Sequence, residues 1–210
     1  MGGARVTWPV LLPLPEQLNK YGAMSVESLQ GYFLIATPQM SDPRFQETVI
    51  LLCAHNEEGA MGLVINQPIR DVELEDIFHN AGIPLPPGAG PLGSVYLGGP
   101  VETGNVFIVY SAEYEVVNHL AVTPSISLSR DPQLLYDLAA GRGPRHYLVS
   151  LGYAGWGAGQ LEAELSVDGW LALPAKDEII FNTPNQHKWR RAAQIHGVDI
   201  GLFGAVVGSA

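Results

Sequence analysis

The sequence predicts an α+β fold, in which a mixed, largely antiparallel sheet carries about four helices. Two observations predict this class. Apolar, β-branched runs come in neighbouring pairs separated by short turns, which is typical of hairpins. Helical segments do not alternate one-to-one with these runs, as they would in a doubly wound parallel sheet. The chain has 210 residues, and no linker or charge block divides it, so we expect a single domain over residues 25–210.

The clearest hairpin lies early in the chain, where "ETVILLCAH" and "GAMGLVIN" flank "NEEG". Asn, an acidic residue and Gly between two apolar runs favour a turn. Under regular alternation, the side chains of Val49, Leu51, Cys53 and His55 share one face, and the intervening residues share the other. Both faces are mostly apolar, so we expect a central strand that is covered on both sides.

The other strands are indicated by apolar runs that end at Pro, Gly or charged residues. They are expected at residues 32–38, 94–101, 105–111, 119–129, 145–153, 170–175 and 178–181. Gly98, Gly99 and Pro100 are expected to form a tight turn between the second and third of these runs.

The helices are indicated by apolar stripes at helical spacing and by residues that favour helix ends. Four helices are expected at residues 71–82, 130–141, 159–169 and 183–197, and a short helical candidate lies at residues 25–30. The best marked helix has Asp131 as its N-cap, Pro132 in its first turn and Gly141 after its end. In the last helix, Thr183 is the expected N-cap and Pro184 the first residue.

Composition and charge narrow the classes of function. The net charge is −10 and the basic residues are scattered, which disfavours direct binding to nucleic acid. The single cysteine, Cys53, allows no internal disulfide and suits a reducing cytoplasm, where we expect the protein. No apolar run is long enough to span a membrane. Residues 1–24 hold a short apolar run broken by prolines, and we expect a poorly ordered extension there.

The stretch "LGYAGWGAGQLEAEL" (residues 151–165) places four glycines between an apolar run and a predicted helix. A strand, a glycine loop and a helix are the layout of a phosphate-binding site. However, no Lys-Ser/Thr pair follows Gly159, and the glycine spacing differs from the dinucleotide fingerprint. We therefore expect the glycines to turn the chain sharply around Trp156, and we expect Gly157→Val to destabilise the fold.

His55 is the main candidate for chemistry, because Cys53 precedes it by two residues and Asn56 follows it. Such a group suits a nucleophile with its base, or part of a metal site. Cys53 lies in a strongly apolar run, where a buried thiol is usually inert. We expect His55 to fix the hairpin by hydrogen bonding. Glu162, Glu164 and Asp168 would suit the lining of a cleft, but acids at such spacing are more typical of a solvated helix face. We expect no metal ion and no cofactor.

Four segments together resemble the YqgE/AlgH family of bacterial proteins. They are "GYFLIATPQMSDPRFQETVILLCAHNEEGAMGLVINQP" (31–68), "LGGPV" (97–101), "GYAGWGAGQLEAEL" (152–165) and "IIFNTPNQHKWRRA" (179–192). The resemblance covers about residues 25–210 and implies a branched sheet rolled into a barrel-like shape. The family is labelled as transcriptional regulators with no established biochemical function, so the resemblance supplies no catalytic residue, cofactor or ligand.

Two functions remain open at this point. The first is a non-enzymatic regulatory protein that acts through a protein partner or a small ligand, because the charge does not suit direct contact with DNA. The second is a small-molecule-binding enzyme, such as a hydrolase, with a cleft near His55 and Trp156. Both would use one predicted surface, which comprises His55, Asn56, Asn66, Gly98, Gly99, Gly155, Trp156 and Gln160.

Overall fold

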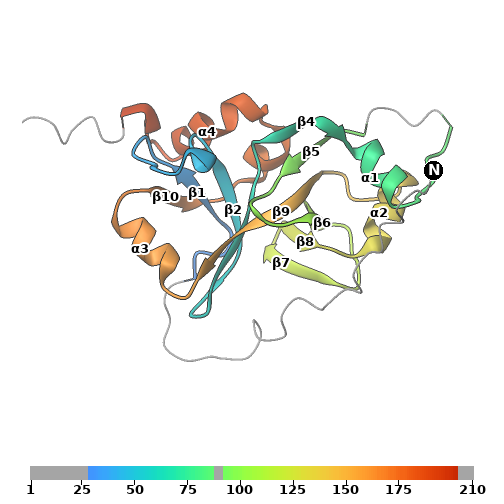
Figure 1. Ribbon diagram of the computed structural model, residues 1–210, viewed down its shortest axis with the longest axis horizontal. Helices are drawn as coiled ribbons and strands as arrows, with labels where there is room; N and C mark the ends of the chain where they lie inside the picture. Colours follow the sequence, from blue (N-terminus) through green and yellow to red (C-terminus); the bar gives the residue numbers. More distant parts are fainter. Residues whose placement is uncertain (1–27, 88–91, 203–210) are drawn as a thin grey trace, which may run out of the picture.

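The computed structural model describes residues 28–87 and 92–202 of the chain (Figure 1). Its strands are β1 (Tyr32–Ala36), β2 (Val49–Asn56), β3 (Gly59–Val64), β4 (Pro68–Glu73), β5 (Ser94–Leu97), β6 (Val101–Ser111), β7 (His119–Thr123), β8 (Ile126–Ser129), β9 (Tyr147–Gly157) and β10 (Trp170–Pro174). Its α-helices are α1 (Leu74–Asn80), α2 (Pro132–Ala139), α3 (Gln160–Ser166) and α4 (Asn185–Gln194). Three shorter helical segments are η2 (Pro43–Phe45), η3 (Glu178–Asn182) and η4 (Ile200–Leu202).

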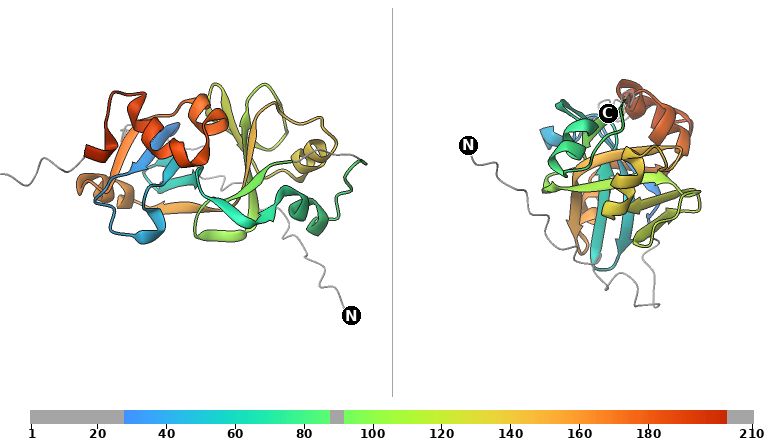
Figure 2. Two further views of the ribbon diagram at one scale, coloured as in Figure 1. Left: turned by 90° about the horizontal axis from the view of Figure 1, so that it is seen from above. Right: turned by 90° about the vertical axis from the view of Figure 1, so that its right-hand side faces the viewer.

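The strands of the described segments form one sheet in the order β10-β1-β2-β3-β9-β6-β8-β7, with β4 and β5 off this path. Strand β9 is the branch point, because it pairs antiparallel with β3 and β6 and parallel with β5. The predicted α+β class, with a mixed, largely antiparallel, branched sheet, is therefore confirmed. The sheet curls into a half-barrel, with α3 and α4 near β1 and β10 and with α1 and α2 at the opposite end (Figures 1 and 2).

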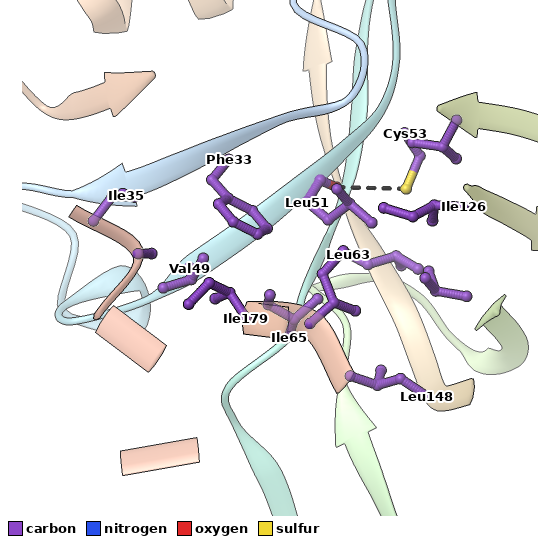
Figure 3. Close-up of a cluster of buried hydrophobic side chains, with 14 of the residues drawn as sticks. Phe33, Ile35, Val49, Leu51, Cys53, Leu63, Ile65, Ile126, Leu148 and Ile179 are labelled. Carbon is purple, nitrogen blue, oxygen red and sulfur yellow. Dashed lines mark hydrogen bonds between the residues drawn. The ribbon is translucent and has the colours of Figure 1, made fainter. Parts of the chain in front are cut away.

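Within the described part of the chain, three apolar clusters hold the sheet and helices together. The central cluster joins β1, β2 and β3 to α4, and it includes Phe33, Leu51, Leu63 and Trp189. Figure 3 shows several of its side chains, among them Phe33, Leu51 and Leu63. A second cluster packs α1 and α2 against β5, β6 and β9. A third, the indole cluster, packs Leu161 of α3 against the sheet together with two tryptophans. Burial of these side chains is the main favourable term for folding.

The best marked helix, α2, forms as its sequence predicts. The Asp131 side chain accepts a hydrogen bond from the Gln133 backbone N–H, and Pro132 occupies the first position. Gly141 follows the helix with φ +69°, a conformation that glycine adopts without steric cost. The predicted start of helix α4, with Thr183 as N-cap and Pro184 as first residue, is wrong by one residue. Pro184 stands at the N-cap, and the Thr183 hydroxyl donates to the Glu178 carbonyl.

Strand β2 departs from regular alternation at a bulge between Leu52 and Ala54. Leu52 lies opposite Gly62 and Ala54 lies opposite Met61, so Cys53 is an extra residue without a partner in β3. Cys53 packs in the central cluster, whereas His55 lies opposite Ala60 of the indole cluster. The predicted sharing of one face by Cys53 and His55 is therefore wrong, since a bulge changes which side the following residues face.

Three other sequence predictions need correction. Strand β9 continues through the glycine-rich stretch to Gly157 and does not end before it. Residues 178–181 are a π-helical turn and not a strand, because consecutive Ile179 and Ile180 are both buried and both donate from their N–H groups to the Lys176 carbonyl. Residues 28–30 are not helical, and the rest of the helix expected at 25–30 lies outside the described residues.

The predicted extension over residues 1–24 also lies outside the described residues, so the domain division stays a prediction. Within residues 28–87 and 92–202, no helix combines the length and the apolar character that crossing a membrane requires.

Candidate functional site

The junction between β9 and α3 positions the most distinctive group of side chains. Gly159 lies at the N-cap of α3 with φ +72°, and it turns the chain from strand to helix. The Gln160 side-chain oxygen accepts a hydrogen bond from the Gly157 N–H at 3.1 Å. Gly157 has no positive φ, and an added Cβ would meet only Gln160, at 3.9 Å. Within β9 the glycine with a positive φ is Gly152, at +71°, so the sharp turn on which the expectation for Gly157→Val rested is not at Gly157.

Glu164 of α3 collects three neutral hydrogen-bond donors. Its Oε2 accepts from the indole N–H of Trp156 at 3.0 Å and of Trp170 at 2.9 Å, and its Oε1 accepts from Gln160 Nε2 at 3.0 Å. The two indoles are almost fully buried and meet edge to face, with 6.3 Å between ring centroids. No described cation lies within ion-pair distance of this carboxylate. Its position therefore depends on uncharged donors alone.

The facing wall comes from the short helix η2. Asp42 caps this helix by accepting from the Arg44 N–H, and the Arg44 guanidinium binds both carboxylate oxygens at 2.6–3.1 Å. This bidentate contact holds the pKa of Asp42 below its ordinary value. The same guanidinium lies 5.7 Å from the centre of the Phe45 ring, which in turn packs edge to face on Trp170.

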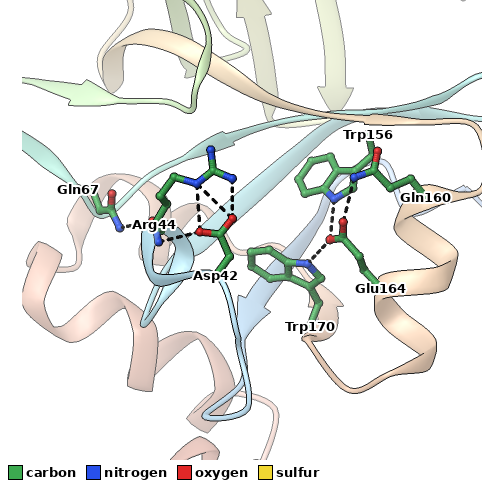
Figure 4. A network of polar contacts seen from close by, with 7 residues as sticks. All are labelled: Asp42, Arg44, Gln67, Trp156, Gln160, Glu164 and Trp170. Carbon is green, nitrogen blue, oxygen red and sulfur yellow. Dashed lines mark hydrogen bonds and ion pairs between the residues drawn. The ribbon is translucent and has the colours of Figure 1, made fainter.

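The two walls enclose a hollow of about 340 Å³, which we call the indole pocket. Figure 4 shows Asp42 and Arg44 on one side of it, and the two tryptophans with Gln160 and Glu164 on the other. Phe45, Gly155 and Pro100 also line it. This size lies at the lower end of small-molecule sites, and the mixture of aromatic and precisely held polar groups is typical of them.

His55 lies beside this pocket and not in its lining. Its ring is almost fully buried, with Nδ1 accepting from the Leu29 N–H at 2.9 Å and Nε2 lying 2.8 Å from Glu162 Oε1. These partners define a neutral imidazole that carries its proton on Nε2. The pKa of Glu162 is lowered, chiefly by a hydrogen bond from its own backbone N–H and secondly by the contact with His55. Glu162 and Glu164 are therefore engaged with the sheet, so the predicted solvated face is wrong for both.

Four residues of the predicted surface have local structural contacts. Asn56 accepts from the Glu58 N–H within the hairpin turn, and Asn66 ties Val49 to Glu47 through both ends of its amide. The two glycines, Gly98 and Gly99, allow close backbone approach, since a Cβ on either would lie within 2.3 Å of β9 backbone atoms. Of the predicted set, the structure brings Gly155, Trp156 and Gln160 together in one pocket, with Pro100 placing the glycine turn at its edge.

Cys53 is fully buried and donates to the Leu51 carbonyl at 3.4 Å. Burial raises the pKa of its thiol to about 12, which keeps it protonated. Because the bulge also separates it from His55, the two residues form no nucleophile–base pair.

Sequence reasoning missed Trp170, Asp42, Arg44 and the role of Glu164. The spacing of Gln160 and Glu164, one helical turn apart after a glycine, was the available signal for a shared face. Nothing in the sequence links that face to the Asp42–Arg44 pair, which lies more than a hundred residues earlier.

The fold and the pocket define a class of protein: an α+β domain with a curled sheet that branches at one strand. The chain belongs to the AlgH-like family, whose profile matches residues 33–201, so the predicted family membership is confirmed. It is 40% identical over 186 residues to the UPF0301 protein DP2218 of Desulfotalea psychrophila, covering 89% of this chain and 97% of that one. It is 43% identical over 176 residues to a UPF0301 protein of Paracoccus denitrificans, covering 82% and 92%.

Two solved structures share the fold. The solution structure of the AlgH protein from Pseudomonas aeruginosa matches with a TM-score of 0.71 and 40% identity, covering 90% of this chain and all of that chain. The crystal structure of DIP2367 from Corynebacterium diphtheriae matches with a TM-score of 0.64, covering 82% of this chain and 90% of that one. At 21% identity, the second match supports the fold alone.

Proposed function

We propose that this chain is a regulatory protein that acts by binding a small organic cation in the indole pocket. One observation carries the proposal: the Glu164 carboxylate is fixed by two indole N–H groups and one amide, and none of these donors neutralises its charge. A carboxylate beside aromatic rings attracts a cation both directly and through the rings. The overall charge of −10 favours the same ligand class.

The lining of the indole pocket favours a cation with a single charge and an apolar body. Arg44 already neutralises Asp42 across the hollow, which leaves Glu164 as the uncompensated charge of the lining. Trp156, Trp170 and Phe45 supply apolar surface around it. A ligand with one ammonium group on a compact aromatic or aliphatic body matches both features.

A role through a ligand also accommodates the charge of the protein, which opposes direct contact with phosphates. The single buried thiol supports the cytoplasmic location that the sequence predicts. The alternative, a hydrolase in this pocket, has less support, because neither His55 nor Cys53 reaches the lining.

A titration with 2-phenylethylamine tests the ligand class, with the uncharged 2-phenylethanol as its match in size. The indole N–H resonances of Trp156 and Trp170 report binding at the pocket. We expect the amine to bind at least tenfold more tightly than the alcohol, because only the amine neutralises Glu164. Equal affinities, or shifts that avoid both indoles, would contradict the proposal.

Glu164→Gln removes the charge and keeps an oxygen that accepts from the indoles. We expect it to abolish the preference for the amine and to leave alcohol binding within about twofold. Glu58→Gln, in the exposed hairpin turn, makes the same charge change away from the pocket and should preserve the preference. A promoter fragment that shifts with the unliganded protein at low salt, where phosphate contacts are strongest, would favour direct DNA binding instead.

A further inference from the structure

A second cavity lies beside helix α4, and Lys188 forms its buried end. The Lys188 side chain is 2% exposed. Its Nζ donates to the Ile65 carbonyl at 2.7 Å and to the Ile180 carbonyl at 2.9 Å. The first carbonyl follows β3 and the second belongs to the π-helical turn η3, so the ammonium joins three separate parts of the chain.

This ammonium has no carboxylate partner within residues 28–87 and 92–202. Two of its three N–H groups bind carbonyls, and the Tyr96 ring lies 5.4 Å from the charge. Burial lowers the pKa of Lys188 to about 8, so the group is still mostly charged at neutral pH. A buried charge that is not neutralised is costly, and a bound anion removes that cost.

The cavity measures about 270 Å³, and its lining includes both polar and apolar side chains. Asn185 lines it together with Lys188, and the Asn185 side-chain oxygen accepts from the Tyr96 hydroxyl at 3.2 Å. That contact leaves the amide N–H₂ of Asn185 as a donor. Leu148 and Phe181 are among the apolar residues of the lining.

The start of helix α4 adds a favourable field near Asn185 and Lys188. Asn185 is the first residue of this ten-residue helix, whose first turn has neither an acidic residue nor a side-chain cap. Backbone N–H groups of an uncapped first turn, together with the helix dipole, favour an anion. Lys188 lies four positions after the N-cap. Without a bound anion, its positive charge has no neutralising partner near the positive end of the helix dipole.

We propose that the Lys188 cavity binds a small carboxylic acid, with its carboxylate on Lys188 and Asn185 and its apolar tail against Leu148 and Phe181. This is a second site, beyond the proposed function, and it shares no lining residue with the indole pocket. A carboxylate suits the site better than a phosphate does, because the lining holds a single cation and because Leu148 and Phe181 offer an apolar surface for a tail. The small volume limits the tail to a compact ring or branched chain.

Benzoate, benzamide and inorganic phosphate distinguish the alternatives in the wild-type protein. Backbone amide shifts of Leu148, Phe181 and Asn185 report binding at the cavity. We expect benzoate to bind at least tenfold more tightly than benzamide, which has the same shape without the charge, and more tightly than phosphate. Equal affinity for benzoate and benzamide would show a merely apolar hollow, and tighter phosphate binding would show a general anion site. Either result overturns the proposal.

Two variants test the roles of Lys188 and Asn185. Lys188→Met should reduce benzoate affinity at least tenfold and leave benzamide affinity nearly unchanged. Asn185→Asp keeps an oxygen for the Tyr96 hydroxyl and suits the first turn of a helix, so it should fold even if Lys188→Met does not. We expect Asn185→Asp to weaken benzoate binding at least tenfold by repulsion.

Gln186→Glu is the matched control, since it adds the same charge to the same helix turn from an exposed position outside the lining. It should change benzoate affinity by less than threefold. An equal loss in Asn185→Asp and Gln186→Glu would contradict a specific site. Glu164→Gln should leave benzoate binding intact, so failure of one site is distinguishable from failure of the other.

Discussion

His55 Nε2 lies 2.8 Å from Glu162 Oε1, and this contact fastens helix α3 to strand β2 across the edge of the indole cluster. The other ring nitrogen accepts from the Leu29 N–H, so one imidazole joins three segments that are far apart in the sequence. The ring is almost fully buried, whereas Glu162 is partly exposed at its outer side.

His55→Phe should destabilise the protein by about 2 kcal/mol. The phenyl ring fills a similar space but leaves the Leu29 N–H and the Glu162 carboxylate without their partner, and each lost hydrogen bond costs about 1 kcal/mol. Urea unfolding measures the change. Glu57→Gln, in the exposed turn of the same hairpin, should stay within about 0.5 kcal/mol of the wild type. Comparable stabilities for the two variants would contradict a stabilising role for the hydrogen bonds of His55.

The stability that the His55–Glu162 contact contributes depends weakly on pH in the acid range. Its pKa is lowered in the folded state, by its own backbone N–H and then by His55. The unfolded chain therefore binds more protons near pH 4, so this contribution is present above the ordinary pKa of 4.5 and is lost as the pH falls through the folded value. Its carboxylate side chain is 39% exposed, so solvent reduces the effect to well under about 1 kcal/mol.

The comparison of Glu162→Gln with the wild type between pH 3 and pH 6 isolates that contribution from other carboxylates. The variant should lose less stability than the wild type on acidification. A steeper loss in the variant would reverse the assigned sign.

Lys188 should make the wild type more stable as the pH rises from about 8 to 10. Its folded pKa of about 8 lies below the ordinary 10.5, so the unfolded chain binds more protons over that interval and unfolding becomes harder with rising pH. The full effect is about 3 to 4 kcal/mol, since the two pKa values differ by about 2.5 and each unit is worth about 1.4 kcal/mol. Lys188→Met should lack this rise in urea unfolding. Parallel curves for the two proteins would show that the buried amine does not titrate in this range.

Gly152 and Gly157 offer a matched pair of substitutions in one strand. Gly152 has φ +71°, and an added Cβ would lie 2.6 Å from the Gly99 carbonyl oxygen, so Gly152→Ala should cost at least about 2 kcal/mol. Gly157→Ala adds a Cβ that meets only Gln160, at 3.9 Å, and should stay within about 0.5 kcal/mol. Thermal unfolding of both variants checks this order, and a reversed order would restore the role first assigned to Gly157.

The class of fold and most elements follow from the sequence, because they depend on local patterns. The hairpin at "NEEG" and the caps of α2 at Asp131 and Gly141 are of this kind. The strand predicted at residues 178–181 is wrong, since a short apolar run fits a strand and a buried helical turn equally well. The bulge at Cys53 carries no signal in a single sequence, yet it decides which side His55 faces.

The candidate sites were predicted less completely than the fold. Trp156 and Gln160 stand out beside the glycines, but their partners Trp170, Asp42 and Arg44 reach the pocket only through tertiary packing. Lys188 belongs to the basic stretch "HKWRR" (residues 187–191), and a lysine in such a stretch is usually exposed. It is buried because the turn at Ile180 and the end of β3 present carbonyls to it.

The bulge gives the only cysteine of this sequence a geometric role. Cys53 is the spare residue of its ladder: Leu51, Leu52, Ala54 and His55 pair in unbroken alternation if it is passed over. Deleting it would therefore spare the register on either side, whereas inserting a residue beside it would turn the imidazole away from α3. Cys53 lies at the bulge, where a strand bends, and its sulfur is shielded from oxidants because the side chain is fully buried in the core.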